Sequence, residues 1–402
     1  MTTDIAIDSA ELGRRLQASR KVTGRRQQEV ADALGVSRPT LAAIEAGQRR
    51  LDARMLVSLA RAYGIPLSDL VKESPPAVAL QAQFRLNGDA GGPDREQLER
   101  AVSKLETRAA AYLQLERLLE NPLRSSPNPP HRYSARRLEQ DAESIADAER
   151  RRLGLGDGPL LRLRELLERT AGMRIFCLEL PSAVGALYGV SADAGPCVAL
   201  NINHAGVRQR WSLAHEYGHL LTHLDRPEVT RTASYLRMPE HERFAERFAA
   251  CFLMPRAGLE RRVYELENAD QNVTIADLLL IADQYEVSFQ ALVLRLEDLG
   301  VLPANTWDLV SNSGANIQAA SKILGVRPLE PDAQRFPRRF IYLAVTAYER
   351  GLLTERQLAD ILEEDRLTVR ELREQLSAAQ SDAGNEDLPV DLSTMIPVGG
   401  RS

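Results

Sequence analysis

The stretch WSLAHEYGHLLTH, residues 211–223, decides the fold of the region around it. It contains His215, Glu216 and His219 in the pattern H-E-x-x-H. Residues four apart on a helix share a face, so both imidazoles can point at one metal ion. Imidazole is a good Zn²⁺ ligand, and the glutamate between them can accept a proton from a water on the metal. The stretch therefore predicts a buried helix, capped by Ser212, that carries two ligands and a general base.

A zinc hydrolase needs three protein ligands and one open position. The stretch ERFAERFAACFLMP, residues 242–255, has apolar residues at helical spacing and predicts a second buried helix. Glu242 and Glu246 are four apart on it, so either could reach the metal.

Two other histidines are weaker ligand candidates. His223 would lie roughly 12 Å from His215 along one straight helix, which is too far to share an ion. His241 adjoins Glu242 but is expected to point off another face of its helix.

The motif R-x-R-W-S-L-A-H-E-Y-G-H-L-L-x-H, followed by E-x-x-A-x-x-F-A-A-x-x-L-M-P, resembles the ImmA/IrrE family of metallopeptidases over residues 138–297. The resemblance implies a gluzincin-like zinc peptidase, often paired with a DNA-binding repressor that it cleaves. It implies Zn²⁺ as cofactor, with Mn²⁺ as the alternative, and matches the third ligand to Glu242. The family usually has Asn or Asp where this chain has Glu246, so both glutamates stay open as the third ligand.

Residues 11–73 are predicted to form five short helices. Gly35 ends the second helix, Ser37 caps the third with Pro39 in its first turn, and Gly47 closes it. A helix, a tight turn with glycine and a capped helix are the signature of a helix-turn-helix.

The wording QQEVADALGVSRPTLAAIEAGQRR, residues 27–50, resembles the Xre/Cro/CI family of repressors. That resemblance implies a homodimer on a double-stranded DNA operator, with the helix after Ser37 in the major groove. Arg38 can read guanine through O6 and N7. Arg20 and Glu45 match an internal ion pair of the family. The candidate contacts to bases or phosphates are Gln27, Ser37, Arg38, Pro39, Thr40, Ala43, Arg49 and Arg50.

Composition indicates a soluble, cytoplasmic protein. The 402 residues carry a net charge of −5, contain no apolar run of 18 residues and begin without a secretory signal pattern. Three cysteines without C-x-x-C spacing predict buried thiols. Residues 11–73 hold twelve basic against seven acidic residues, a net +5, so the remainder carries −10. Only the N-terminal region is therefore expected to meet a polyanion.

The expected fold class is mainly α (α+β), with three strands at residues 173–180, 183–190 and 196–203 before the metal helix. A substrate backbone could add to the strand at 185–190 or to that at 198–203. The expected domains are 11–73 for DNA binding, 74–134 as linker and long helix, 135–300 for the peptidase, 301–376 as C-terminal helices and 377–402 as a disordered tail. The long helix, 95–119, could form a dimer or cover the peptidase core. Thr354 and Gln357 predict a capping box.

These features predict a DNA-binding transcriptional regulator with a zinc endopeptidase domain. It would cleave a repressor or partner protein in a stress or mobile-element response, with no membrane involved. The alternatives are a metal- or effector-sensing repressor without proteolysis, and an antitoxin-like regulator of a toxin–antitoxin pair. Glu216 favours the enzyme, because a structural site needs no general base. For the oxyanion, Tyr217 faces elsewhere and Tyr235 is a candidate.

Overall fold

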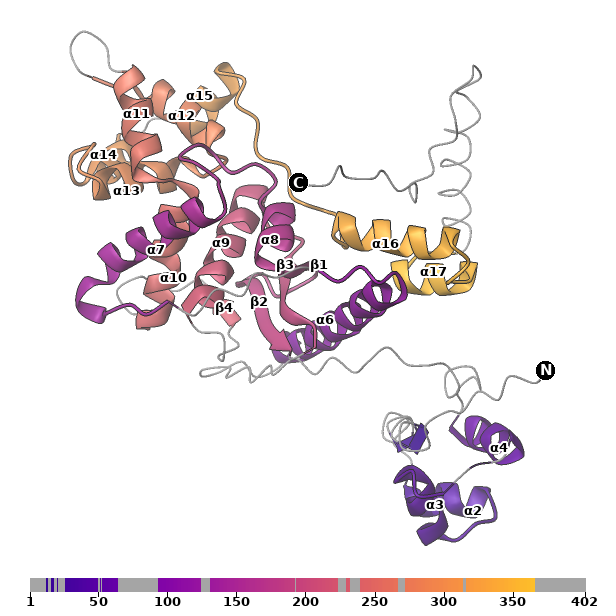
Figure 1. Ribbon diagram of the computed structural model, residues 1–402. Helices are drawn as coiled ribbons and strands as arrows, with labels where there is room; N and C mark the ends of the chain where they lie inside the picture. The colour runs from indigo at the N-terminus through magenta and orange to yellow at the C-terminus, as the bar shows by residue number, and fades with distance from the viewer. Residues whose placement is uncertain are drawn as a thin grey trace, which may run out of the picture. The chain divides into compact units, whose positions relative to one another are not determined.

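The computed structural model describes residues 12–13, 16–17, 20, 26–49, 51, 53–63, 93–123, 131–191, 193–222, 229–231, 239–266, 272–313 and 316–365. The chain divides into two compact units, Met1–Pro75 and Pro76–Ser402, each considered by itself (Figure 1). The described part is mainly helical with one small sheet, which confirms the predicted class. None of its helices has the length and apolar character needed to span a bilayer.

The first unit contains the predicted helix-turn-helix. Gly35, in the turn between α2 and α3, has a φ of +66°, a conformation that suits glycine. Ser37 caps α3, because its Oγ accepts a hydrogen bond of 3.3 Å from the N–H of Thr40. A Cβ on Gly13 would lie 2.7 Å from the carbonyl oxygen of Glu45, so glycine lets this part of the chain approach closely. The helices are α2 (Gln27–Ala33), α3 (Arg38–Glu45) and α4 (Ala53–Tyr63).

These helices share a small apolar core. Residues 12, 13, 16, 17 and 20 are also helical, as expected for the predicted first helix, whereas the predicted fifth helix lies outside the described residues. The core consists of Leu12, Leu16, Val30, Ala31, Leu41, Ile44, Leu59 and Ala60.

The second unit is built on a mixed four-stranded sheet in the order β1-β3-β2-β4. The three predicted strands are all present, and a short fourth strand joins them along β2. β1 runs parallel to β3, and the other two pairings are antiparallel. The strands are β1 (Arg174–Leu178), β2 (Val184–Ser191), β3 (Gly195–Asn201) and β4 (Val229–Arg231).

Both faces of the sheet are buried, in two separate cores. Along β1, Ile175 and Cys177 face one core, whereas Phe176 and Leu178 face the other. This alternation follows the two-residue period of a strand. Burial on both sides explains why the strand sequences are almost continuously apolar.

The first core is covered by four helices, and the last two of them carry the predicted metal ligands. These helices are α7 (Leu138–Arg152), α8 (Leu163–Ala171), α9 (Gly206–Thr222) and α10 (Glu240–Leu253). The helices that follow are α11 (Arg256–Leu266), α12 (Ile275–Gln284), α13 (Phe289–Asp298), α14 (Thr306–Asn312) and α15 (Ile317–Ile323). Ser288 caps α13, because its Oγ accepts a hydrogen bond of 3.1 Å from the N–H of Ala291. The backbone of Arg162 is in the left-handed region, and α8 begins at the next residue, Leu163.

The prediction that Ser212 caps the metal helix was wrong. α9 begins six residues earlier, at Gly206, and Ser212 lies inside it. A Cβ at Gly206 would lie 2.6 Å from the carbonyl oxygens of Leu329 and Glu330, so this glycine lets a distant segment pack on the helix start. Ser212 instead packs against Gly185 of β2, where any Cβ would meet its side chain.

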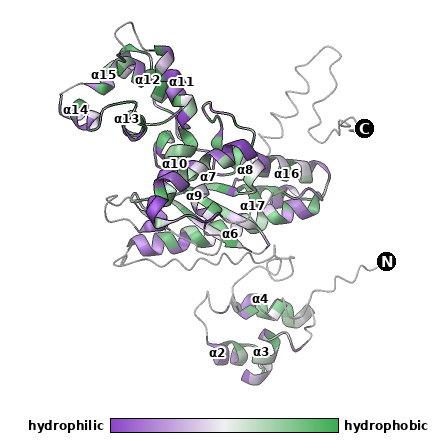
Figure 2. Ribbon diagram, turned by 60° about the vertical axis from the view of Figure 1, so that its left-hand side comes forward, coloured by the Kyte–Doolittle hydropathy of each residue, from purple (hydrophilic) through white to green (hydrophobic). Residues whose placement is uncertain are grey.

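The second core is covered by α6 (Pro93–Leu118), α16 (Arg338–Glu349) and α17 (Glu355–Leu362). Of the two roles considered for the long helix, α6 has the covering role: it packs on the sheet together with the C-terminal helices. Figure 2 shows hydrophobic and hydrophilic residues mixed along α6, as expected of a helix with one buried face. Glu116 of α6 is buried and accepts from Arg174 at 2.6 Å and from Arg339 at 2.7 Å. The predicted capping box of α17 is confirmed.

Candidate metal centre

Three predicted ligands meet where α9 and α10 lie side by side (Figure 1). His215 and His219 are one turn apart on α9, and Glu242 lies in the first turn of α10. The Nε2 atoms of the two histidines are 3.0 Å apart. Glu242 places Oε2 at 3.2 Å from the first of these nitrogens and Oε1 at 3.3 Å from the second. Ligand atoms of all three residues lie within 4.8 Å of one another.

This donor set fits a zinc ion. In a tetrahedral site with metal–ligand distances of about 2.0–2.2 Å, ligand atoms lie roughly 3.3–3.6 Å apart. The distances between the three side chains, 3.0–3.3 Å, are close to that edge length. Both imidazoles are 1% exposed, and the Glu242 side chain is 13% exposed. Two nitrogens and one carboxylate leave a fourth position open, as in catalytic zinc sites.

The charges at the centre are strongly coupled. Burial alone would lower the pKa of His215, but its hydrogen bonds with Glu242 and Glu246 raise that pKa to about 10. Burial alone would raise the pKa of Glu242, but its hydrogen bonds with His215 and His219 hold that pKa far below its ordinary value. A metal ion and the His215 proton therefore compete for the same imidazole.

Glu246 occupies a different position from Glu242. Its Oε2 lies 3.2 Å from Nδ1 of His215, and its Oε1 accepts a hydrogen bond of 2.9 Å from the indole N–H of Trp211. A carboxylate on the far nitrogen of a ligand histidine fixes its tautomer and ring orientation. The sequence reasoning missed this role for Glu246 and for Trp211. The signal was the matched four-residue spacing of Trp211 and His215 on one helix and of Glu242 and Glu246 on the other.

Glu216, the candidate general base, is fully buried. It is four residues beyond Ser212, so it lies on the face of α9 that packs against β2 at Gly185. Tyr217 faces the core, as expected: its hydroxyl donates to Glu149 at 2.6 Å.

Three other predictions concern the surroundings of the centre. His241 was expected to point away, and this was wrong: in the first turn of α10 its ring centroid lies 6.1 Å from that of His219, and its Nε2 lies 3.9 Å from Glu242. His223 and Tyr235 lie outside the described residues.

The two strands predicted to receive a substrate backbone are both interior. β3 lies between β1 and β2, and β4 pairs with β2 over residues 184–187. The expected role of β3 as an edge strand was therefore wrong, as was that of β2 over these residues. The sequence does not reveal strand order, because β1 pairs with β3 rather than with the next strand along the chain.

In the first unit, the predicted DNA contacts lie on α3 and next to its ends, except for Gln27, which is the first residue of α2. Ser37, Arg38, Pro39 and Arg49 are exposed, Thr40 and Ala43 are half-buried, and Arg50 lies outside the described residues. The predicted internal pair is present, since Arg20 donates to Glu45 at 2.7 and 3.0 Å. Gln27 also donates to Glu45, at 2.9 Å, so its amide braces α3 in this structure.

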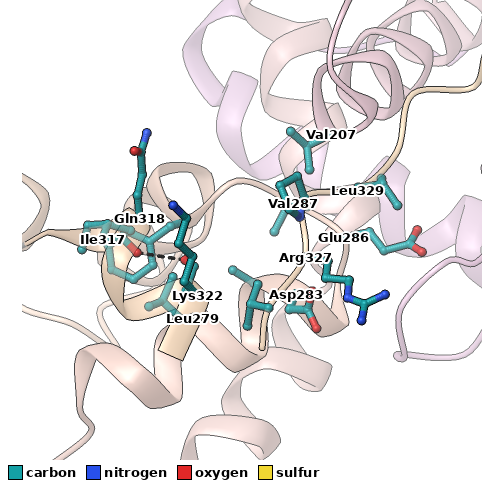
Figure 3. Close-up of a pocket in the computed structure, with 15 residues that line it drawn as sticks. Val207, Leu279, Asp283, Glu286, Val287, Ile317, Gln318, Lys322, Arg327 and Leu329 are labelled. Atoms are coloured by element: carbon teal, nitrogen blue, oxygen red, sulfur yellow. Dashed lines mark hydrogen bonds between the residues drawn. The ribbon is translucent and has the colours of Figure 1, made fainter. Parts of the chain in front are cut away.

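A cavity of about 580 Å³ lies away from the metal centre, between α12, α15 and the segment that follows α15 (Figure 3). Its wall is largely apolar, with Leu279, Val287 and Ile317 among the residues that line it. None of its lining residues belongs to the donor cluster, so it contributes nothing to the metal chemistry.

The helix-turn-helix and the buried donor cluster together define a DNA-binding domain fused to a domain of metallopeptidase type. Residues 16–70 match the helix-turn-helix family, and residues 168–297 match the family described as the IrrE N-terminal-like domain. These two matches confirm the predicted resemblance to an Xre-type helix-turn-helix domain joined to an ImmA/IrrE-like domain.

Other comparisons add little. The crystal structure of ComR from Streptococcus suis aligns with 94% of this chain and 92% of its own, at 11% identity and a TM-score of 0.16. A score that low carries no argument about fold or function. No curated protein matches the chain.

Proposed function

We propose that this protein is a transcriptional regulator whose second unit is a zinc-dependent endopeptidase. It cleaves a repressor or partner protein in a stress or mobile-element response. His215, His219 and Glu242 hold the zinc, Glu216 is the general base, and Glu246 positions His215. The first unit binds a near-palindromic operator as a homodimer, through Arg38 and its neighbours on α3.

The observation that carries the peptidase proposal is the spacing of the three donor groups. Their atoms lie 3.0, 3.2 and 3.3 Å apart, which is close to the edges of a tetrahedral zinc site. The two imidazoles are 1% exposed and the Glu242 side chain is 13% exposed, so the donor groups are largely shielded from solvent. Glu216 adds a carboxylate next to His215 along the helix, which a purely structural metal site does not require.

Each residue has a distinct task in this proposal. When bound, zinc polarises a carbonyl and lowers the pKa of water towards about 7. Glu216 takes the proton from the attacking water and later passes it to the leaving amine. Glu246 accepts a hydrogen bond from Nδ1 of His215, which keeps Nε2 directed at the donor cluster.

The test is a cleavage assay on the full-length protein. The purified protein is incubated with Zn²⁺ or Mn²⁺, alone and with the products of neighbouring genes, and the mixtures are analysed by mass spectrometry. We expect one discrete cut that is lost in Glu216→Gln and kept in Glu260→Gln, a surface glutamate of α11 whose side chain is 46% exposed. Cleavage that persists in Glu216→Gln would contradict the proposed base.

A further inference from the structure

A second cavity lies at the end of β1, beside α6, and none of its lining residues belongs to the metal-ligand cluster. Its volume is about 450 Å³, and it is lined by the first half of α6, the end of β1 and the chain at Arg335. Small-molecule sites in proteins have volumes of about 300–1,000 Å³. This cavity therefore has room for a small organic molecule, but not for a nucleic-acid duplex.

The lining of this cavity is strongly basic. Arg100, Lys104 and Arg108 come from α6, and Arg335 comes from the extended segment before α16. Glu179 is the one acidic residue of the lining. Glu363, just after α17, is not in the lining but pairs with Lys104 at 2.9 Å and with Arg108 at 2.7 Å. Four cations against two carboxylates leave a net charge of about +2.

Two of these cations have no side-chain partner in the part of the chain that the structure describes. Among the described residues, the guanidinium groups of Arg100 and Arg335 have neither an ion pair nor a side-chain hydrogen bond. Both residues are exposed at the cavity. They extend from different walls, so an anion between them would receive donors from two sides.

The third arginine, Arg108, is held in a fixed position by several contacts. The Arg108 side chain is 3% exposed, and its Nη1 donates to the backbone oxygens of Cys177 at 3.0 Å and Arg335 at 3.3 Å. Its guanidinium stacks over the ring of Phe336, 4.5 Å from the centroid. The N–H of Cys177 also donates to the backbone oxygen of Arg335, at 3.1 Å. The backbone that carries Arg335 is therefore fixed to β1.

We propose that this cavity binds a small phosphate-bearing molecule, as an effector site separate from the metal centre and from the DNA-binding unit. Guanidinium groups present paired donors that match the geometry of phosphate oxygens. Arg100 of α6 and Arg335 of the segment before α16 both bind the phosphate, and Lys104 turns from Glu363 to the ligand. The binding site thus connects α6 with the end of α17, because Lys104 and Arg108 of α6 both pair with Glu363.

The test is isothermal titration of the full-length protein with orthophosphate, pyrophosphate and adenosine triphosphate at physiological ionic strength. We expect one pyrophosphate or nucleotide site per chain. Each of Arg100→Gln and Arg335→Gln should weaken binding about tenfold or more, since each removes a charge-assisted contact. Glu179→Gln should tighten binding, because it removes the acidic residue of the lining. Arg95→Gln, an exposed residue of α6 outside the cavity, should change nothing.

The outcomes separate the sources of the phosphate. Tighter binding of the nucleotide than of pyrophosphate would assign the site to an organic phosphate, and equal binding would assign it to free polyphosphate. No binding of any of the three would overturn the proposal. So would wild-type affinity in both Arg100→Gln and Arg335→Gln, and so would binding lost in Arg38→Ala, which would place the anion on the DNA-binding unit. Circular dichroism checks that each variant is folded.

Discussion

The carboxylate of Glu246 lies 3.2 Å from Nδ1 of His215, on the opposite side of the ring from Glu242. The two glutamates are one turn apart on α10, yet they contact different nitrogens of one imidazole. Glu242 also approaches His219, at 3.3 Å, whereas Glu246 also binds Trp211. Their substitution should therefore have different consequences for the metal.

The first prediction concerns metal content. Glu242→Ala and His219→Ala should abolish stoichiometric zinc in elemental analysis, since each removes a ligand. Glu246→Ala should retain zinc but weaken its affinity about 10–100-fold in a chelator competition, as expected for a residue that orients a ligand. Loss of stoichiometric zinc in Glu246→Ala, with full zinc in Glu242→Ala, would exchange the two roles.

The second prediction separates catalysis from sensing. Glu216→Gln should keep zinc and DNA affinity, because Glu216 is not a ligand, but should lose derepression of the target promoter under the inducing stress. Loss of a general base typically slows a reaction about 10²–10⁴-fold. His219→Ala should lose both zinc and derepression. A normal promoter response in Glu216→Gln, together with a defective one in His219→Ala, would favour a sensor.

The third prediction concerns DNA recognition. Arg38→Ala should cost about 1–3 kcal/mol of binding free energy and relax specificity at one base pair. Arg49→Ala should weaken all sequences alike and reduce the salt dependence, as expected for a phosphate contact. Both residues are exposed, so neither change should unfold the domain. Gel-shift titrations against operator variants at two salt concentrations measure the difference, and equal loss of specificity in both variants would argue against the assignment.

The fourth prediction concerns the ion pair between Arg295 of α13 and Glu143 of α7. Arg295 is fully buried and donates to Glu143 at 2.6 Å and to the backbone oxygen of Met254 at 3.2 Å. Arg295→Ala should reduce the free energy of unfolding by about 3 kcal/mol, because it leaves a carboxylate without its partner. Urea unfolding measures this loss, and Arg356→Ala on the surface of α17, where the side chain is 57% exposed, serves as the control. An unchanged midpoint in Arg295→Ala would contradict the prediction.

The same pair has a defined pH dependence. Burial alone would raise the pKa of Glu143, but its hydrogen bond with Arg295 lowers that pKa below its ordinary value. The folded state therefore binds the proton less well than the unfolded state does. The stability from Glu143 is fully present above the ordinary carboxyl pKa and is lost as the pH falls through the lower folded-state pKa. The free energy of unfolding of Glu143→Gln, measured as the pH is lowered, should therefore fall less than that of the wild type.

Local features of the sequence predicted local structure well. The Ser37 cap, the turn at Gly35 and the capping box of Thr354 depend on residues within a few positions of one another. The spacing of His215 and His219 likewise needs only the helical period. These predictions hold because capping and periodicity are properties of a short segment.

Features that depend on distant contacts were not predictable in the same way. Ser212 is a residue type that often caps helices, but the helix begins earlier, at Gly206. There the absence of a side chain lets the backbone of Leu329 pack closely. The position of His241 depends on how α10 lies against α9. The order of the strands in the sheet depends on which strands pair with one another, and no short sequence motif encodes that pairing.

The two-faced sheet has a consequence for dividing this protein into fragments. The match to the IrrE N-terminal-like domain ends at residue 297, yet one face of the sheet packs against helices that begin at Arg338. A fragment trimmed to the matched residues would expose Phe176 and Leu187, which are both fully buried in the intact chain. Because these apolar side chains would be exposed to solvent, such a fragment should aggregate or bind another protein through them. The region that matches the IrrE N-terminal-like domain is therefore shorter than the segment needed to cover both faces of the sheet.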